Sequence, residues 1–120
     1  MEHNKNCVDS TQKEDYLKYS YVVKNEEENV IAGILAYAVI WGILYIDTLW
    51  VDSKYRKQGI ATTLLNKIIE DGKEDGCHIV HVSTFDFQSP EFYKSMGFEC
   101  FGILPNAPKG HSEHFFYRNI

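Results

Sequence analysis

The chain has 120 residues, of which 44% are hydrophobic and 14% aromatic, and its formal net charge is −5 at pH 7. This hydrophobic content excludes a disordered chain, and the length fits a single domain over 1–120 with a modest core. The negative charge disfavours general binding to nucleic acid. We expect no membrane span, because Asp47 and two glycines interrupt the longest apolar segment, 30–51.

The N-terminal segment 1–15 is polar and has no helical or strand periodicity, so we expect it to be loose or reduced. Its polar composition is unlike that of a secretory signal peptide, so we expect none. The three cysteines, Cys7, Cys77 and Cys100, are too scattered for a disulfide framework or a paired metal site. We therefore expect reduced thiols and a cytoplasmic protein.

Three β-rich segments follow, over 16–24, 30–40 and 43–51. The first alternates roughly between apolar and polar residues, and all three are rich in β-branched or aromatic side chains. The charged run 25–29 and the pair Trp41-Gly42 supply the turns between them. Short strands joined by short turns predict an antiparallel meander.

An amphipathic helix is predicted over 59–74, because apolar residues recur at helical spacing on one face. A buried strand over 78–85 follows and should run parallel to the strand before the helix. A short helix over 89–97 begins with a proline at its first helical position, and strands over 98–104 and 114–120 end the chain. The sequence thus predicts an α+β fold with a mixed, mostly antiparallel central sheet and flanking helices.

The turn between the third strand and the long helix carries the most specific signal of the sequence. A helix start presents backbone N–H groups without intrahelical partners at the positive end of the helix dipole, which suits a phosphate. The small residues Gly59 and Ala61 let a large ligand approach this backbone closely. Arg56 and Lys57 add positive charge at the same place. The turn therefore predicts a site for a phosphate-bearing ligand.

The order Arg56-x-x-Gly59-x-Ala61, after a strand and before a helix, resembles the acyl-CoA-binding motif of the GNAT N-acetyltransferase superfamily. A Val-Asp-x-x-Tyr-Arg lead-in and a leucine-rich helix flank it. Downstream, the segment 92–98 looks like the family's tyrosine-bearing helix and Gly-Phe turn. The resemblance covers 16–120. It implies a GNAT-like fold whose central sheet has a V-like splay, with acetyl-CoA as co-substrate and no metal.

The resemblance also implies which residues hold the co-substrate. The pyrophosphate is expected on the backbone of the turn, and the pantetheine arm along the strand before it, in a β-strand-like mode of recognition. The family often places an asparagine on the pantetheine arm, where this chain has Asp86, Gln88 and Ser89. The expected cofactor-binding residues are Leu49, Val51, Arg56, Lys57, Gln58, Gly59, Ile60, Ala61 and Thr62.

Two residues are candidates for the chemistry of acetyl transfer. Tyr93 matches the tyrosine that several members place near the CoA sulfur, and a phenol of pKa about 10 is a suitable proton donor to a thiolate of about 8.5. Asp47 lies where many members carry a strand glutamate that deprotonates the amine, directly or through water. The alternatives are a Tyr93 ring that only packs, and an Asp47 carboxylate at an edge or paired with a backbone N–H.

The histidines offer a metal site or an acceptor contact as alternatives. His78 and His81 are three apart in a predicted strand and face opposite ways, and His111 and His114 have the same spacing. No cysteine or carboxylate completes a tetrahedral set beside them, so we predict no metal. His111 or His114 could instead lie near the acceptor entrance, or be ordinary surface residues.

The front of the chain departs from the family pattern. A typical member carries a strand and two helices before the position of Tyr16, and 15 residues are too few for all three. Either the domain is reduced, or a second subunit completes the wall of the acceptor site, or the sequence is truncated. A shortened N-terminal part would leave apolar surface and a strand edge uncovered, so we expect a homodimer. We interpret Trp41 and Trp50 as core or interface aromatics.

The sequence as a whole predicts an acetyl-CoA-dependent N-acetyltransferase. It would move an acetyl group by direct transfer to a primary amine of a small molecule or protein, and the acidic chain weakly favours a cationic acceptor. The alternative is a non-catalytic, acyl-CoA-binding or regulatory module of the same fold.

Overall fold

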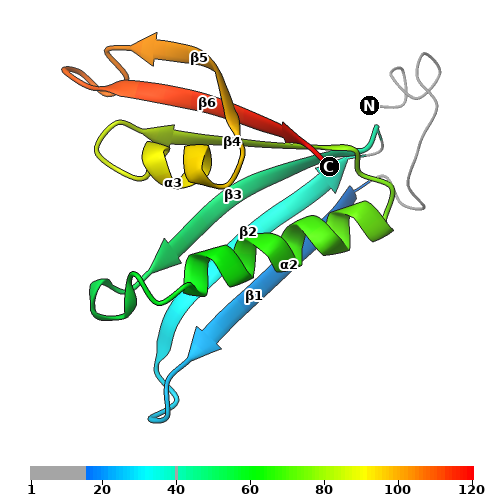
Figure 1. Cartoon of the computed structure of the whole chain (residues 1–120), viewed down its shortest axis with the longest axis vertical. Helices are drawn as coiled ribbons and strands as arrows, with labels where there is room; N and C mark the ends of the chain where they lie inside the picture. The colour runs from blue at the N-terminus through cyan, green and yellow to red at the C-terminus, as the bar shows by residue number, and fades with distance from the viewer. Residues whose placement is uncertain (1–15, 40) are drawn as a thin grey trace.

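A computed structural model describes residues 16–39 and 41–120, so the expectations for 1–15 and for Ile40 lie outside the described residues. Six strands form one open sheet in the order β1-β2-β3-β4-β6-β5 (Figure 1). The elements in chain order are β1 (Tyr16–Lys24), β2 (Val30–Val39), β3 (Ile43–Val51), the 3-10 helix η1 (Ser53–Tyr55), α2 (Ile60–Glu74), β4 (Ile79–Phe85), α3 (Pro90–Ser95), β5 (Glu99–Pro105) and β6 (Ser112–Asn119).

The predicted strand directions are confirmed. Strands β1, β2 and β3 form the antiparallel meander, β3 runs parallel to β4, and β6 pairs antiparallel with both β4 and β5. The last strand begins two residues earlier than predicted. Ser112 already pairs with Pro105, and its backbone N–H donates to the carboxylate of Asp86, so the ladder extends to the hairpin.

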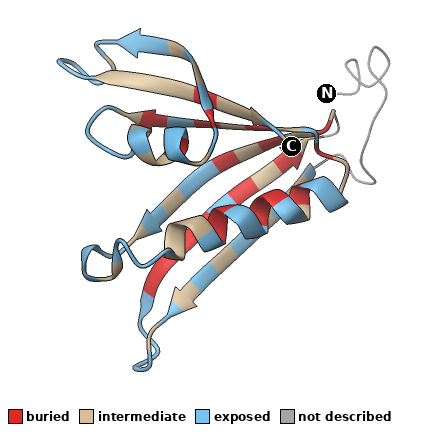
Figure 2. Cartoon of the chain, in the orientation of Figure 1, coloured by how far each residue is buried: buried red, intermediate tan, exposed pale blue. Residues whose placement is uncertain are grey.

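Both helices lie on one face of the sheet, and the core lies beneath them (Figures 1 and 2). Helix α2 buries the apolar face that its periodicity predicts, and small alanines of β2 let it approach the sheet closely. Two tyrosines of β1 fix it further: Tyr19 donates to Asp75 at 2.6 Å, and Tyr21 donates to Asp71. None of the described helices is long and apolar enough to cross a bilayer.

The sheet opens between β3 and β4, which confirms the expected splay. These strands pair only at three positions, the last of them Tyr45 with His81, and then diverge. A β-bulge lies just beyond that point: Leu35 pairs with Thr48 and Ala36 with Ile46, which leaves Asp47 as the extra residue. A bulge bends its strand and re-aims the side chain that it carries, so Asp47 lies where β3 turns away from β4.

The opposite face of the sheet carries no described helix and is rich in aromatic rings. Tyr16, Tyr37 and Tyr45 stack in series across three strands, with ring centroids 5.4 and 5.1 Å apart. The row continues through His81, at 5.2 Å from Tyr45, to Phe101 of β5, at 5.5 Å from His81. We call this the helix-free face.

Candidate active site

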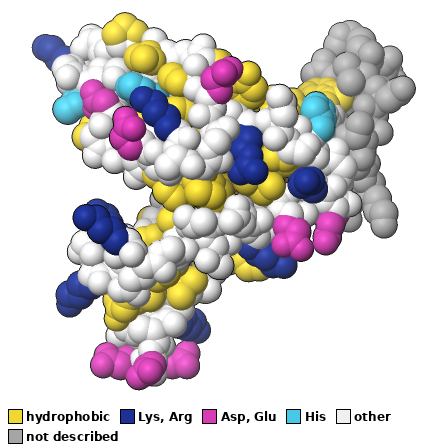
Figure 3. Space-filling model, in the orientation of Figure 1, with side chains coloured by type: hydrophobic (Ala, Val, Ile, Leu, Met, Phe, Trp, Pro, Cys, Tyr) yellow, Lys and Arg dark blue, Asp and Glu magenta, His cyan; other side chains and the backbone are white. Residues whose placement is uncertain are grey.

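The divergence of β3 and β4 creates a cleft of about 780 Å³ that is closed at one end by the first turn of α2 and the helix α3. The space-filling view shows the molecule hollowed between its two halves, with basic side chains on one margin (Figure 3). The part of β3 from Ile46 to Val51 forms one wall, and Val82 to Phe85 of β4 forms the other. A cleft of this size accommodates an extended ligand of drug-like dimensions or larger.

The turn that leaves β3 is held by its own hydrogen bonds. The side chain of Asp52 accepts from the backbone N–H of Lys54 at 3.0 Å, and its carbonyl accepts from Tyr55 at 2.9 Å. Arg56 donates from Nε to the carbonyl of Val51 at 3.1 Å, which ties the guanidinium to the end of β3. These contacts fix the course of the turn and hold the Arg56 guanidinium at the end of β3, in the lining of the cleft.

Gly59 begins α2 in a conformation that other residues rarely adopt. Its φ is +80°, in the left-handed region, and no atom lies within 4 Å of the place that a Cβ would occupy. No side chain caps the helix, and the first helical bond runs from Thr63 to the carbonyl of Gly59. The N–H groups of Ile60, Ala61 and Thr62 therefore face open space at the positive end of the dipole. This turn fits a pyrophosphate bound by backbone groups.

The edge of β3 is available for an extended arm. Beyond Tyr45 no residue of β3 pairs with β4, so the backbone between 46 and 51 has one unpaired side. Leu49 and Val51 lie in this part of the cleft wall. An unpaired strand edge binds extended amide-containing groups through main-chain hydrogen bonds, which is the chemistry that a pantetheine arm offers.

Tyr93 comes from α3 and lies at the inner end of the cleft. Its side chain is only 5% exposed, and its ring packs against Phe92, Phe98 and Phe116 with centroids 5.2–6.0 Å apart. Its hydroxyl has no hydrogen-bond partner among the described residues. Burial raises the pKa of Tyr93 to about 12, so the phenol stays protonated at neutral pH. The raised pKa also makes this phenol a weaker acid than a free one, so it matches a thiolate of pKa about 8.5 less closely than the sequence alone indicates.

Asp47 is exposed rather than buried, because the bulge turns it out of the apolar layer into the cleft. The cost of a buried, unpaired carboxylate therefore does not arise. No other acidic side chain is found among the described residues that line the cleft. Asp47 makes no hydrogen bond with any described residue, so its carboxylate is available to a ligand.

The structure brings the predicted residues together with one exception. All of the expected cofactor and catalytic residues line the cleft apart from Gln58, which lines a neighbouring hollow of about 480 Å³ with Lys24 and Tyr55. The cleft is also lined by aromatic side chains that the sequence did not assign to the site, namely Trp50, Tyr55, Phe85, Phe87 and Phe92. Trp50, interpreted from the sequence as a core or interface aromatic, is exposed and lies outside the core. Neighbouring residues of a strand face opposite sides of the sheet, so the sequence alone could have placed Trp50 on the face opposite Leu49.

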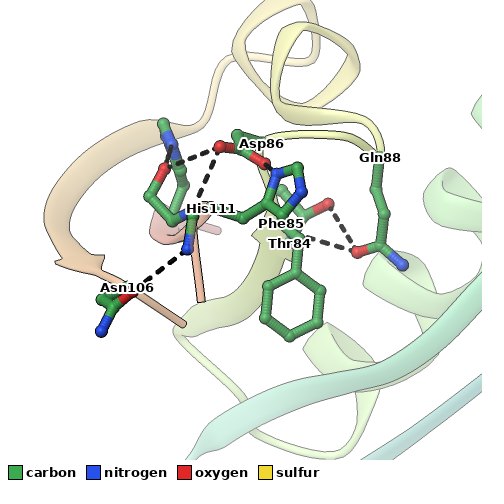
Figure 4. A network of polar contacts seen from close by, with 9 residues as sticks. Thr84, Phe85, Asp86, Gln88, Asn106 and His111 are labelled. Atoms are coloured by element: carbon green, nitrogen blue, oxygen red, sulfur yellow. Dashed lines mark hydrogen bonds and ion pairs between the residues drawn. The ribbon is translucent and has the colours of Figure 1, made fainter. Parts of the chain in front are cut away.

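A polar network joins the end of β4 to the β5–β6 hairpin (Figure 4). Asp86 lies 3.0 Å from His111 Nδ1 and accepts from the backbone N–H of Ser112 at 3.1 Å. Loss of hydration raises the pKa of Asp86, but the hydrogen bonds from His111 and Ser112 outweigh it and hold that pKa below its usual value. His114 contacts the Ser112 hydroxyl at 2.9 Å.

This network places His111 at the hairpin and turns Asp86 toward it, outside the residues that line the cleft. Gln88 instead lines the cleft, where its side-chain oxygen accepts from Thr84 and from the backbone N–H of Phe85. Within 16–39 and 41–120, no group of three or more histidine, cysteine or acidic residues is placed to hold a metal ion.

A mixed sheet splayed beside an uncapped helix start with basic residues, and a buried tyrosine in the cleft lining, is the arrangement expected of an acyl-CoA-dependent N-acyltransferase. The sequence profile of the Acetyltransferase (GNAT) family matches residues 2–98. The chain therefore belongs to the GNAT acetyltransferase family.

Individual relatives agree with this assignment. The chain is 33% identical over 95 residues to the blasticidin-S acetyltransferase of Streptomyces morookaense, an alignment that covers 78% of this chain and 70% of that protein. A crystal structure of an acetyltransferase from Bacillus cereus is 37% identical, with a TM-score of 0.90 over 99% of this chain and 84% of that one.

A more distant structure shows the same fold with its co-substrate bound. It is a candidate streptothricin acetyltransferase of Bacillus anthracis in complex with acetyl coenzyme A, 20% identical to this chain. Its TM-score is 0.76, and the match covers 90% of this chain and 64% of that one.

Proposed function

We propose that the protein transfers an acetyl group from acetyl-CoA to a primary amine of a small molecule, directly and without an acetylated enzyme. The observation that carries this proposal is that one cleft is lined by the phosphate-binding turn at Gly59, the open edge of β3, Tyr93 and Asp47. A relative named for the acetylation of blasticidin S, at 33% identity, supports a small-molecule acceptor.

Each residue has a separate task in this reaction. The turn at Gly59 and the edge of β3 would hold acetyl-CoA, whose thioester supplies the acetyl group. Asp47 takes a proton from the acceptor ammonium, directly or through water, so that the neutral amine can attack. Tyr93 gives its proton to the sulfur as the C–S bond breaks, and its phenolate takes up the proton that the new amide nitrogen loses. Alignment of the two reactants in one cleft supplies the largest part of the rate enhancement, on the order of 7–11 kcal/mol.

The proposal is tested by measuring acetyl-CoA-dependent thiol release with amines of several classes, beside the direct binding of CoA by calorimetry. Polyamines, aminoglycosides, nucleoside amines and lysine peptides cover small-molecule and protein acceptors. Thiol release that depends on an amine is the expected result. Tight CoA binding without turnover on any amine would point to the alternative, a binding or regulatory module.

Replacing Asp47 tests its role as the base. Asp47→Asn keeps the shape of the side chain but removes its proton affinity, so we expect the acidic limb of the pH–rate profile to shift or flatten and kcat/KM to fall by about 10²-fold. The measurement is the pH dependence of kcat/KM. Glu70→Gln, an exposed carboxylate of α2, is the matched control and should leave the profile unaltered. An unaltered profile in Asp47→Asn would remove Asp47 from this role.

We further propose that a second copy of the chain covers the row of rings on the helix-free face, from Tyr16 to Phe101, and leaves the cleft beyond Tyr45 open. The hydrophobic residues exposed on this face include Tyr16, Val22, Leu35 and Phe101. The face is also self-complementary in charge, since its β1 margin carries Lys18 and its β5–β6 margin carries Glu99. A two-fold axis parallel to the strands brings these margins together.

Light scattering at micromolar concentration is expected to give the mass of a dimer. Phe101→Glu should give a monomer, because Phe101 is 54% exposed on the helix-free face and a charge there opposes the contact. Ile103→Glu, at a residue 58% exposed that pairs with His114 of the other face, should remain a dimer. A monomeric parent chain with full activity would contradict the proposed assembly.

A further inference from the structure

The mouth of the cleft on the helix-free face is lined by exposed aromatic side chains for which acetyl transfer itself has no use. On the β3 margin, Trp50 is 43% exposed and its indole lies over Gly33, where a Cβ would meet Nε1 at 3.0 Å. On the β4 margin, Phe85 shares the helix-free face with His81 by strand alternation, and Phe87 next to it is 57% exposed. Trp50, Phe85 and Phe87 all line the cleft.

The rings on the β4 margin are held in a fixed arrangement. Phe85 and Phe87 are stacked, with centroids 5.4 Å apart and planes only 3° from parallel. Phe87 and His111 meet edge to face with ring centroids 4.9 Å apart, and His111 is held by Asp86 at 3.0 Å. An exposed but immobilised flat ring is a platform on which another planar ring can stack, at little cost in side-chain entropy.

The charged side chains of the cleft lie in two places, with basic residues at one end and a carboxylate on the wall formed by β3. Arg56 and Lys57 lie at the end where the phosphates are expected, and Asp47 is the sole acidic side chain among the described residues of the lining. Asp47 lies on the bulge of β3, in the same wall as Trp50. The acceptor side of the cleft therefore offers one carboxylate and aromatic rings on both margins, a combination that suits a cationic amine attached to a planar ring.

We propose that the acceptor is a primary alkylamine whose chain ends in an aromatic or heteroaromatic ring. The ring stacks at the mouth, on Phe87 and beside Trp50, while the ammonium group reaches Asp47 and is presented to the thioester. This inference rests on the proposed function, because it identifies the class of acceptor for the same cleft. It makes Phe87 a residue that determines specificity and takes no part in proton transfer.

The test compares two amines that share the same ethylamine chain and differ in the ring, 2-phenylethylamine with a planar aromatic ring and 2-cyclohexylethylamine with a saturated, non-planar one. We expect the chain to acetylate the aromatic amine with a kcat/KM about tenfold higher, since loss of one stacking contact is of this order. Phe87→Ala should raise KM for the aromatic amine about tenfold, leave kcat unchanged and have no effect on the cyclohexyl amine. Ile103→Ala truncates an equally exposed hydrophobic residue outside the cleft and should change neither amine.

Equal kcat/KM for the two amines, or an equal effect of Phe87→Ala on both, would overturn the inference. Failure of the proposed function has a different signature, namely no amine-dependent thiol release with any acceptor. In that case the ring site is tested separately, by calorimetric titration of 2-phenylethylamine into the CoA-saturated protein. Binding that Phe87→Ala weakens supports the ring site, whereas absent binding or binding that Phe87→Ala leaves unchanged excludes it.

Discussion

Gly59→Asp is expected to abolish the binding of CoA while the protein stays folded. The new side chain would project into the open space above the turn, where we expect the pyrophosphate, and would add a negative charge beside it. The measurement is calorimetric titration with CoA, and we expect an affinity loss of at least about 10³-fold from steric exclusion and like-charge repulsion together. The thermal midpoint should fall by only a few degrees, because the left-handed backbone is mildly strained in any residue other than glycine.

Gly110 provides a matched control for this substitution. Its φ is +82°, nearly that of Gly59, and nothing lies within 4 Å of the place that a Cβ would occupy. It belongs to the hairpin before β6 and does not line the cleft. Gly110→Asp therefore carries the same backbone strain and charge and should bind CoA normally. Normal CoA affinity in a folded Gly59→Asp protein would remove the phosphate site from this turn.

Tyr93→Phe is expected to lower kcat by roughly 10²-fold or more with little change in CoA affinity. The hydroxyl makes no hydrogen bond to a described residue, and the ring is held by Phe92, Phe98 and Phe116, so removing the oxygen should leave the packing intact. Only the proton donated to the departing thiolate is lost. The measurement is steady-state turnover of acetyl-CoA with a saturating amine.

Tyr117 provides the control, because its replacement by phenylalanine removes a hydroxyl from a tyrosine that does not line the cleft. Tyr117 donates to Glu99 at 2.6 Å on the helix-free face, outside the residues that line the cleft. Tyr117→Phe should turn over at the parent rate. If Tyr93→Phe also keeps the parent kcat, Tyr93 is a packing residue and the thiolate receives its proton from another group.

Local patterns were sufficient to predict much of the fold. The spacing of Leu64, Leu65, Ile68 and Ile69 predicts the buried face of α2 without knowledge of its partner. A turn with Gly59 at a helix start likewise predicts an anion site from backbone physics alone. These features depend on residues close together in the sequence, which is why periodicity and turn chemistry suffice to identify them.

Features that depend on distant contacts could not be predicted in the same way. The bulge that exposes Asp47 arises from the register between β2 and β3, and two antiparallel strands give no local sign of a one-residue slip. The fixed position of Phe87 depends on His111, which Asp86 holds across 25 residues of sequence. The aromatic mouth of the cleft could therefore not be predicted from the sequence, because it depends on the packing of the β5–β6 hairpin against the end of β4.

The central claim, acetyl transfer to an amine, is tested most directly by following the acetyl group itself. The protein is incubated with acetyl-CoA deuterated in the acetyl group and with an amine that stimulates thiol release, and the products are analysed by mass spectrometry. We predict that the amine carries the deuterated acetyl group in an amount equal to the thiol released, and that Gly59→Asp forms none. Thiol release without a labelled amine, or with the label retained on the protein, would contradict direct transfer.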